Sequence, residues 1–354
     1  MKIVPVILIT LLCTGCDIIH TAANSSVDFL RQQFVTGYYY RTGTAQQRRE
    51  FQSLFTLLDQ EPGDERCAVI REIITRYLRQ KDYGRLINFL NEQIKDGDPY
   101  NAYYAFSIAF AYLQLNAPQV VFLYCDMILK NYPDVFVDGQ SIHFACLNEL
   151  IALDSNPESQ VHWYQELIAR FPEKIDAGVT YFMLAKAYEK TGAWNDAIKT
   201  YTKYLDFPGT IVPDYPDSDH YAKQLVDFNK SPKDWTFENL NTLVATIKSA
   251  LNAGNSTQLW QYRAKVNFFA RSWAQEATDD FGMADFNLGQ FMSGRISYTN
   301  QLDASSNAVE AYLRTWGWAQ YSTWYLYFRK INFPADPEIH GRWEWAGLYY
   351  GEKF

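Results

Sequence analysis

One pattern of apolar, small and aromatic residues returns about every 37 residues in the middle of the chain, and it constrains the fold more than any other feature. Its clearest copy spans residues 181–208, where large apolar and aromatic residues recur at helical spacing on both sides of Gly192. Glycine tolerates the left-handed backbone of a sharp turn, and Pro208 lacks the N–H that would continue a helix. The pattern therefore predicts two short helices joined at Gly192, the second of which ends before Pro208.

Three further copies begin near residues 67, 102 and 141. In the copy that begins near 102, Asn116 takes the place of Gly192, and asparagine is the next best residue for a left-handed turn. An earlier helical pair over 27–39 and 45–59 fits a degenerate first unit. Consecutive helix pairs of this kind stack on one another and bury a shared core. We therefore expect residues 27–208 to form one helical repeat domain.

The copies between residues 67 and 208 resemble the tetratricopeptide repeat (TPR). The resemblance implies an α-α superhelix, a TPR-like solenoid, whose first helices line a groove that holds a peptide or a partner helix. Carried onto this sequence, the groove positions of the family fall on Arg71, Tyr103, Phe106, Phe110, Gln114, Phe182, Lys186 and Lys190.

The aromatic residues among these positions leave two possibilities open. If Tyr103, Phe106 and Phe110 are exposed, they form an apolar surface for a partner. Alternatively, they pack against a neighbouring repeat or against the C-terminal domain.

The N-terminus has the features of an export signal. Lys2 precedes an apolar run that is too short to span a bilayer, which takes about 20 residues. The residues Cys13-Thr14-Gly15-Cys16 that follow resemble a bacterial lipobox, in which the final cysteine becomes lipidated. The resemblance implies a signal peptide at 1–15, acyl chains on Cys16 and a tether at 16–26, and hence a membrane anchor. An ordinary signal peptide with incidental cysteines is the alternative.

The second half of the chain has a different composition. Prolines and a glycine near its start indicate a linker at 209–236, although a short helix also fits the later part of this segment. Beyond it we expect helices over 237–251 and 256–262. Strand-forming residues then dominate five segments, at 266–273, 295–300, 311–320, 323–331 and 342–351. Residues 237–354 are therefore expected to form a smaller, aromatic-rich α+β domain with a curved antiparallel sheet.

Tryptophan is concentrated in this C-terminal domain, and two interpretations remain open. The rings could stack against a sugar, an aromatic ligand or a proline-rich peptide. Alternatively, they fill the core of a small domain.

Charge and motifs exclude several classes of function. Asp and Glu number 40 against 32 Lys and Arg, so the net charge of −8 disfavours a nucleic-acid partner. The sequence lacks the motifs of serine hydrolases, zinc proteases, P-loop proteins and dinucleotide-binding enzymes. An acidic cluster at Glu276, Asp279, Asp280 and Asp285 does not have the spacing of a calcium loop. We therefore expect no catalytic residue, no metal and no cofactor.

Cys67, Cys125 and Cys146 fit no metal-binding spacing, and we expect them to be buried free thiols.

These features predict a membrane-anchored bacterial lipoprotein that acts in the cell envelope as a protein–protein interaction scaffold. Its partners would be another envelope protein or peptide, held in the TPR groove, and the membrane, reached through Cys16. The alternative is a ligand-binding or enzymatic C-terminal α+β domain with the repeats as scaffold.

Overall fold

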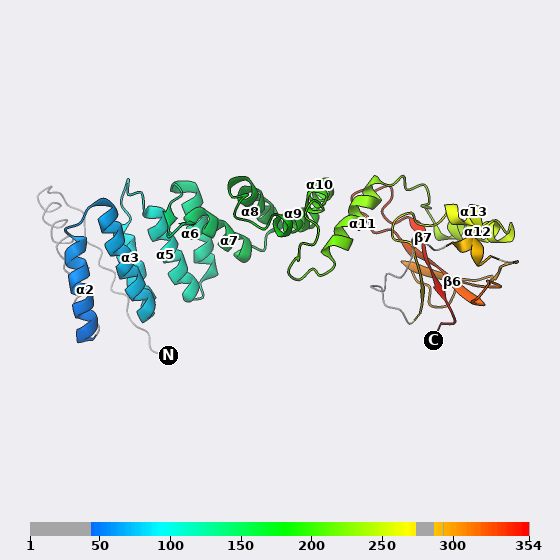
Figure 1. Cartoon of the computed structure of the whole chain (residues 1–354), viewed down its shortest axis with the longest axis horizontal. Coiled ribbons are helices and arrows are strands. Elements are labelled where there is room, and N and C mark those ends of the chain that lie inside the picture. The colour runs from blue at the N-terminus through cyan, green and yellow to red at the C-terminus, as the bar shows by residue number, and fades with distance from the viewer. Residues whose placement is uncertain (1–43, 274–286, 293, 354) are drawn as a thin grey trace, which may run out of the picture. The chain divides into compact units, whose positions relative to one another are not determined.

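The computed structural model describes residues 44–273, 287–292 and 294–353, which fall into two compact units (Figure 1). Unit 1 ends at Leu153 and unit 2 begins at Asp154, inside the segment 27–208 that was expected to be one repeat domain. The expected signal peptide, the tether with Cys16 and the helix over 27–39 lie outside the described residues.

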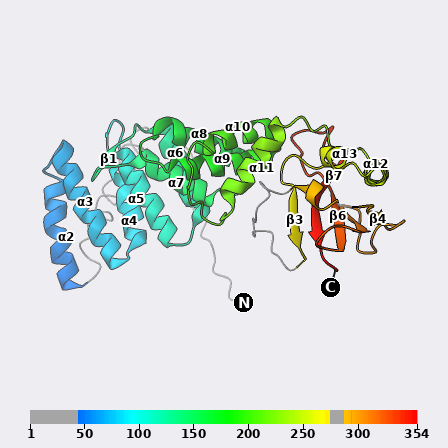
Figure 2. The ribbon, with the colours of Figure 1, turned by 45° about the vertical axis from the view of Figure 1, so that its right-hand side comes forward.

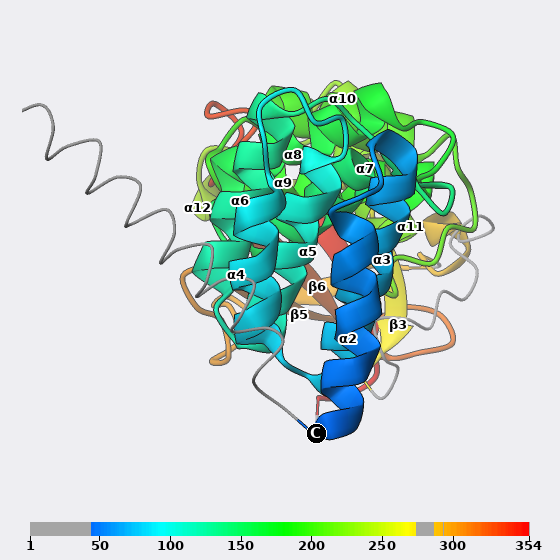
Figure 3. The ribbon, with the colours of Figure 1, turned by 90° about the vertical axis from the view of Figure 1, so that its left-hand side faces the viewer.

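Unit 1 consists mainly of helices, and each helix from α3 to α6 packs on the one before it in the chain (Figure 1). Figure 3 looks along this series of helices, with α2 in front. The helices are α2 (Ala45–Leu58), α3 (Gly63–Gln80), α4 (Tyr83–Gln93), α5 (Asn101–Gln114), α6 (Pro118–Asn131) and α7 (Ile142–Leu153). The turn between α5 and α6 contains Asn116 at a φ of 57°, so the left-handed turn predicted there is confirmed. A small hairpin of β1 (Phe136–Val137) and β2 (Gln140–Ser141) precedes α7.

The core of unit 1 is formed by the apolar positions of the repeat pattern. Ile73 of α3, Leu86 and Leu90 of α4 and Ile108 of α5 are all inaccessible to solvent. Tyr77 of α3 stacks on an aromatic ring of α2, with centroids 4.6 Å apart. Each fully buried side chain of this size contributes roughly 1.5–3 kcal/mol to folding, so these contacts account for the stacking of α2 to α5.

Unit 2 begins with four helices and continues into an α+β region. The first four helices are α8 (Pro157–Arg170), α9 (Ala177–Thr191), α10 (Trp194–Tyr204) and α11 (Ser218–Lys230). Gly192 follows α9 at a φ of 78°, which confirms the turn predicted from the repeat pattern. The next two helices, α12 (Leu240–Asn252) and α13 (Ser256–Gln261), agree with the two predicted for this region.

A five-stranded sheet follows, with strand order β3-β7-β6-β5-β4. Its strands are β3 (Phe269–Ser272), β4 (Ser297–Tyr298), β5 (Glu310–Trp316), β6 (Thr323–Lys330) and β7 (Trp343–Tyr350). Helices α12 and α13 lie on one side of this sheet (Figure 2). Four strands fall within predicted strand segments and β5 begins one residue before its segment, so a helix-rich N-terminal part followed by a smaller α+β region is confirmed.

The prediction of an antiparallel sheet is wrong at one edge. Strands β4 to β7 pair antiparallel, whereas β3 pairs parallel to β7. Parallel neighbours require a long crossover rather than a hairpin, and here most of the sheet intervenes between the two strands in the chain. The sheet is therefore mixed.

Residues 209–236, where a linker was expected, are instead packed into the core of unit 2. They contain α11, and Val212, Ala222, Val226 and Trp235 are each at most 3% exposed. One continuous core joins Phe182 of α9 to Leu348 of β7 through these residues. The helices of unit 2 and its sheet therefore form one body.

Most tryptophans of the C-terminal part are core residues. The indoles of Trp235, Trp318, Trp324, Trp343 and Trp345 are at most 6% exposed. Trp318 and Trp324 stack with centroids 4.5 Å apart. These rings fill the interior, as the second of the two interpretations requires.

Candidate functional site

The groove residues expected in unit 1 lie mostly along one face of α5. Tyr103, Phe106, Phe110 and Gln114 recur at helical spacing along the less buried side of α5, and Tyr103 still packs against the core that contains Tyr104 and Ile108. Tyr103 and Phe106 are half-buried, Phe110 is 41% exposed and Gln114 is exposed. We call these four residues the α5 stripe.

Arg71 of α3 lies beside the α5 stripe and is held by an ion pair. Its Nη2 donates to both carboxylate oxygens of Asp138, at 2.6 and 2.5 Å. This hydrogen bond raises the pKa of Arg71 above its ordinary value, and Tyr103 contributes in the same direction. Burial raises the pKa of Tyr103, and Arg71 partly offsets that effect. The structure therefore brings together Arg71 and Tyr103, which the repeat pattern assigned to consecutive first helices.

Asp138 was not expected at this site from the repeat pattern. This residue and Gly139 form the two-residue turn of the β1–β2 hairpin, with φ values of 51° and 78°. An Asp-Gly pair between two short strand-like segments is a strong hairpin signal, and it could have identified the turn.

The groove residues expected in unit 2 have three different environments. Phe182 is fully buried between Tyr201, Tyr204 and Tyr215, so its assignment to a groove is wrong. The expected groove face of α9 is covered at this point by the segment that leads into α11. Lys190 is exposed.

Lys186 belongs to a buried polar network, which we call the Glu189 network. Glu189 Oε2 accepts from Lys186 Nζ at 2.5 Å, while Glu189 Oε1 accepts from the hydroxyls of Tyr201 and Tyr221 at 2.8 and 2.7 Å. Burial, followed by the neighbouring carboxylate, raises the pKa of both tyrosines. The Lys186 ammonium also lies 4.6 Å from the centroid of the Tyr221 ring. The charge on Lys186 is thus compensated within the protein.

A cavity of about 240 Å³ opens beside this network. Phe182, Tyr215 and Tyr221 provide aromatic walls, and Asp214 and Asp217 are exposed among its lining residues. Because Lys186 is already paired, the chemistry left for a ligand is aromatic and acidic.

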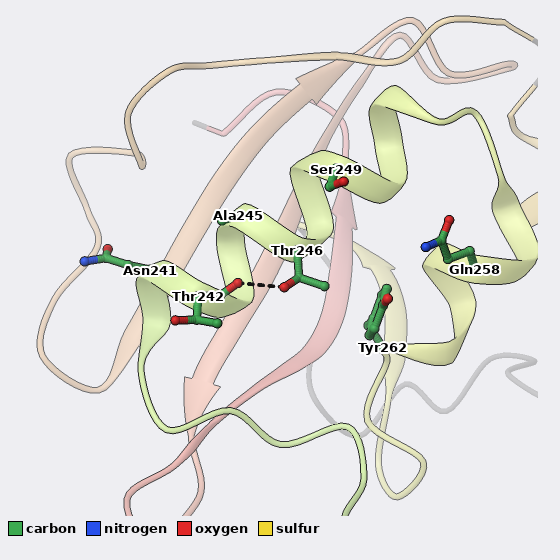
Figure 4. Close-up of a pocket in the computed structure, with 7 residues that line it drawn as sticks. All are labelled: Asn241, Thr242, Ala245, Thr246, Ser249, Gln258 and Tyr262. Carbon is green, nitrogen blue, oxygen red and sulfur yellow. Dashed lines mark hydrogen bonds between the residues drawn. The ribbon is translucent and has the colours of Figure 1, made fainter.

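A second hollow, of about 570 Å³, lies on the outer side of α12 and α13 (Figure 4). Its lining is uncharged and consists of Asn241, Thr242, Ala245, Thr246, Ser249, Gln258 and Tyr262. The Thr246 hydroxyl donates to the Thr242 carbonyl at 2.9 Å, so it is already satisfied by its own helix. The lining of this hollow contains no Asp, Glu, His, Lys or Arg side chain.

The cysteines and the acidic cluster were also named from the sequence. Cys67, Cys125 and Cys146 are buried free thiols, as predicted. Cys16 and the acidic cluster of Glu276, Asp279, Asp280 and Asp285 lie outside the described residues. Within the described ranges, no group of three or more His, Cys, Asp or Glu side chains is placed to hold a metal.

No protein-family model matches the chain, and no curated protein matches it at a significant level. None of the helices in the described parts of the chain has both the length and the hydropathy that crossing a bilayer requires.

Proposed function

We propose that the protein is a bacterial lipoprotein, anchored in the cell envelope through Cys16, which recognises a partner protein or peptide with the first helices of a TPR-like superhelix. The lipid would fix the location, and the α5 stripe would provide the contact surface.

The α5 stripe carries this proposal. Phe110 is 41% exposed and Phe106 is half-buried, although the opposite face of the same helix is fully buried. Aromatic side chains that are partly exposed at rest bury a large apolar area when a partner covers them, and such residues dominate interface energetics. Arg71 adds a cation at the edge of the stripe, where it can exchange Asp138 for an acidic group of a partner.

The contact surface can be tested with serine substitutions at Tyr103, Phe106 and Phe110. The triple variant should lose a partner that co-purifies with the wild-type protein from native membranes, while its helical circular dichroism is retained. Phe110→Ser alone should weaken capture, and this single change avoids the half-buried positions.

Leu123→Ser is the matched control, because Leu123 of α6 is 63% exposed but lies on the second helix of its pair. It should leave capture unchanged. Capture that survives the triple change, or that falls equally in the control, would contradict the assignment of the surface.

The anchor is tested separately. Cys16→Ser should abolish incorporation of labelled palmitate and move the protein out of the membrane fraction. If the variant stays in that fraction, Cys16 is not the anchor.

A ligand-binding role of the C-terminal domain, with the repeats as scaffold, is the second candidate. A cavity lined by Arg329, whose Nε is held by Glu344, favours this role.

A further inference from the structure

Unit 2 contains another cavity, of about 210 Å³, between α11 and the end of β6. Its apolar part is formed by Phe228 and Phe333, whose ring centroids are 4.8 Å apart. The polar residues that line it are Gln224, Asn267, Arg329, Lys330, Asn332 and Glu344. We call this site the Arg329 cavity.

Arg329 is held in place by a buried carboxylate. Its Nε donates to Glu344 Oε1 at 2.8 Å, and Glu344 Oε2 accepts from the indole Nε1 of Trp235 at 2.8 Å. The Glu344 side chain is 2% exposed and that of Arg329 is 35% exposed. The ion pair therefore has one end in the core and one end at the cavity.

The two Nη groups of Arg329 remain available for a ligand. Only Nε is used by Glu344, and the Nη groups have no hydrogen-bond partner among the residues that the structure describes. Glu310 lies opposite Arg329 on β5, but its carboxylate accepts from Asn307 and from Tyr327. A guanidinium that is fixed at Nε and free at Nη presents part of its donor fork in a defined direction.

Burying the Glu344 carboxylate is costly, and apolar residues of the same volume would often stabilise a core as well or better. A buried pair that orients a partly exposed arginine is, by contrast, a typical way to preorganise a binding group. The arrangement of Trp235, Glu344 and Arg329 therefore fits recognition better than stability.

The electrostatics of the cavity favour an anion, although the whole chain is acidic. Lys330 lines the cavity with Arg329. The Nζ of Lys233 lies 5.8 and 6.0 Å from the ring centroids of Phe228 and Phe333, so a third cation is close to the apolar part. Glu344 is the single carboxylate among the lining residues.

We propose that the Arg329 cavity binds a small carboxylate with an apolar body, whose carboxylate pairs with the Nη groups of Arg329 and whose body covers Phe228 and Phe333. This site goes beyond the scaffold role of the α5 stripe. A planar monoanion matches a guanidinium fork. A phosphate dianion fits less well, because Glu344 already neutralises part of the arginine's charge. The volume lies below the usual range for drug-sized ligands, so the ligand is a small free acid or the last residue of a peptide.

Benzoate is the probe that tests the proposal, because it combines a carboxylate with a flat apolar ring. A ligand-observed NMR titration of the full-length protein should show saturable binding with a Kd of about 1 mM or lower, as a ligand of this size allows. Benzamide, which has the same shape without the charge, should bind at least about tenfold more weakly because it lacks the charge-assisted bond. Inorganic phosphate should not displace benzoate at equal concentration.

Two variants test the geometry. Arg329→Lys keeps the positive charge but loses the two parallel N–H donors of the guanidinium. It should weaken benzoate binding by about tenfold or more. Asn332→Ala removes an amide donor from the cavity lining and leaves the buried ion pair of Arg329 and Glu344 intact. It should weaken benzoate binding without affecting folding, so it tests the site even if Arg329→Lys is unstable. Arg314→Gln is the matched control, because Arg314 lies on β5 of the same sheet, pairs with Glu352 and does not line the cavity.

The outcomes separate the proposal from its alternatives. Absence of saturable benzoate binding, or binding that neither Arg329→Lys nor Asn332→Ala weakens, would overturn it. If benzoate binds as proposed, a peptide that ends in phenylalanine with a free carboxylate is compared with the same peptide as its C-terminal amide. If the acid binds more tightly than benzoate, the ligand is a chain terminus, and if neither peptide binds, the ligand is a free small acid. Loss of partner capture through the α5 stripe would not change any of these results.

Discussion

The two units differ in how far apart along the chain the residues of each core lie. In unit 1 the main core cluster runs only from Phe51 to Ala111, so each helix packs on neighbours in sequence. In unit 2 one cluster joins Phe182 to Leu348, and it includes α9 to α13 and the sheet. A stack of helix pairs has stability that is nearly a sum over neighbouring contacts, whereas a core that joins distant elements forms or is lost as a whole. We therefore expect local unfolding in unit 1 and cooperative unfolding in unit 2.

The largest effect is expected for Trp235→Ala. The indole is fully buried, and its loss also leaves Glu344 without one of its two donors. Unfolding of unit 2 should become easier by about 3–5 kcal/mol. Hydrogen-exchange mass spectrometry should show α9–α11 and β6–β7 losing protection together, with unit 1 unchanged.

Trp316→Ala is the control for that experiment, because Trp316 lies in the same sheet but is 39% exposed, and it should cost less than about 1 kcal/mol. If Trp235→Ala exposes only the helices or only the sheet, the two do not share one core.

The matching change in unit 1 is Ile73→Ala. Ile73 is inaccessible to solvent in α3, so the truncation should cost about 2–5 kcal/mol. Loss of exchange protection should be confined to α2–α5, because the core around Ile73 is local. Protection lost throughout unit 2 as well would show that the two units are coupled.

A smaller effect is expected at the parallel edge of the sheet. A methyl group added at Gly347 would lie 2.6 Å from the ring of Phe269 on β3. Gly347→Ala should therefore lower the free energy of unfolding by about 1–3 kcal/mol through overpacking. Chemical denaturation measures this cost. In the double variant with Phe269→Ala the two losses should be less than additive, and simple additivity would show that the ring does not cover Gly347.

The smallest effect depends on pH. Burial, with a hydrogen bond to Asp219, raises the pKa of Tyr204 to about 12. In the unfolded chain a tyrosine ionises near pH 10, so between these values the unfolded state loses its proton first and unfolding becomes more favourable. This stabilisation is complete below pH 10 and is lost as pH rises towards 12.

By pH 11 Tyr204 alone should cost about 1 kcal/mol of stability. Tyr204→Phe removes that pH dependence, so the difference in unfolding free energy between pH 8 and pH 11 should be smaller in the variant. An identical difference in both proteins would mean that Tyr204 ionises normally in the folded state.

The parts of the fold that depend on local sequence were predictable. The left-handed turns at Asn116 and Gly192 follow from residue type and spacing, and the strands follow from runs of β-branched and aromatic residues. Pairing between distant segments was not predictable, and the parallel contact of β3 with β7 is the main example. Periodicity assigns a side chain to a face, but it does not say which element will cover that face.

The same limit explains which site residues were identified. Arg71 and Tyr103 meet because their helices are consecutive first helices of the repeat pattern. Phe182 is buried by a segment outside the repeat frame, and no local pattern predicts that contact. The pairing of Arg329 with Glu344 depends on cross-strand register, which a single sequence does not specify.

The central claim, that the α5 stripe is a recognition surface, is tested most directly by site-specific photo-cross-linking in native membranes. A photoreactive phenylalanine analogue is placed at Phe110 in one sample and at Leu123 of α6 in another, so that two exposed apolar positions of the same unit are compared. We predict one reproducible protein adduct from position 110 and none from position 123. No adduct from position 110, or the same adducts from both positions, would contradict the claim.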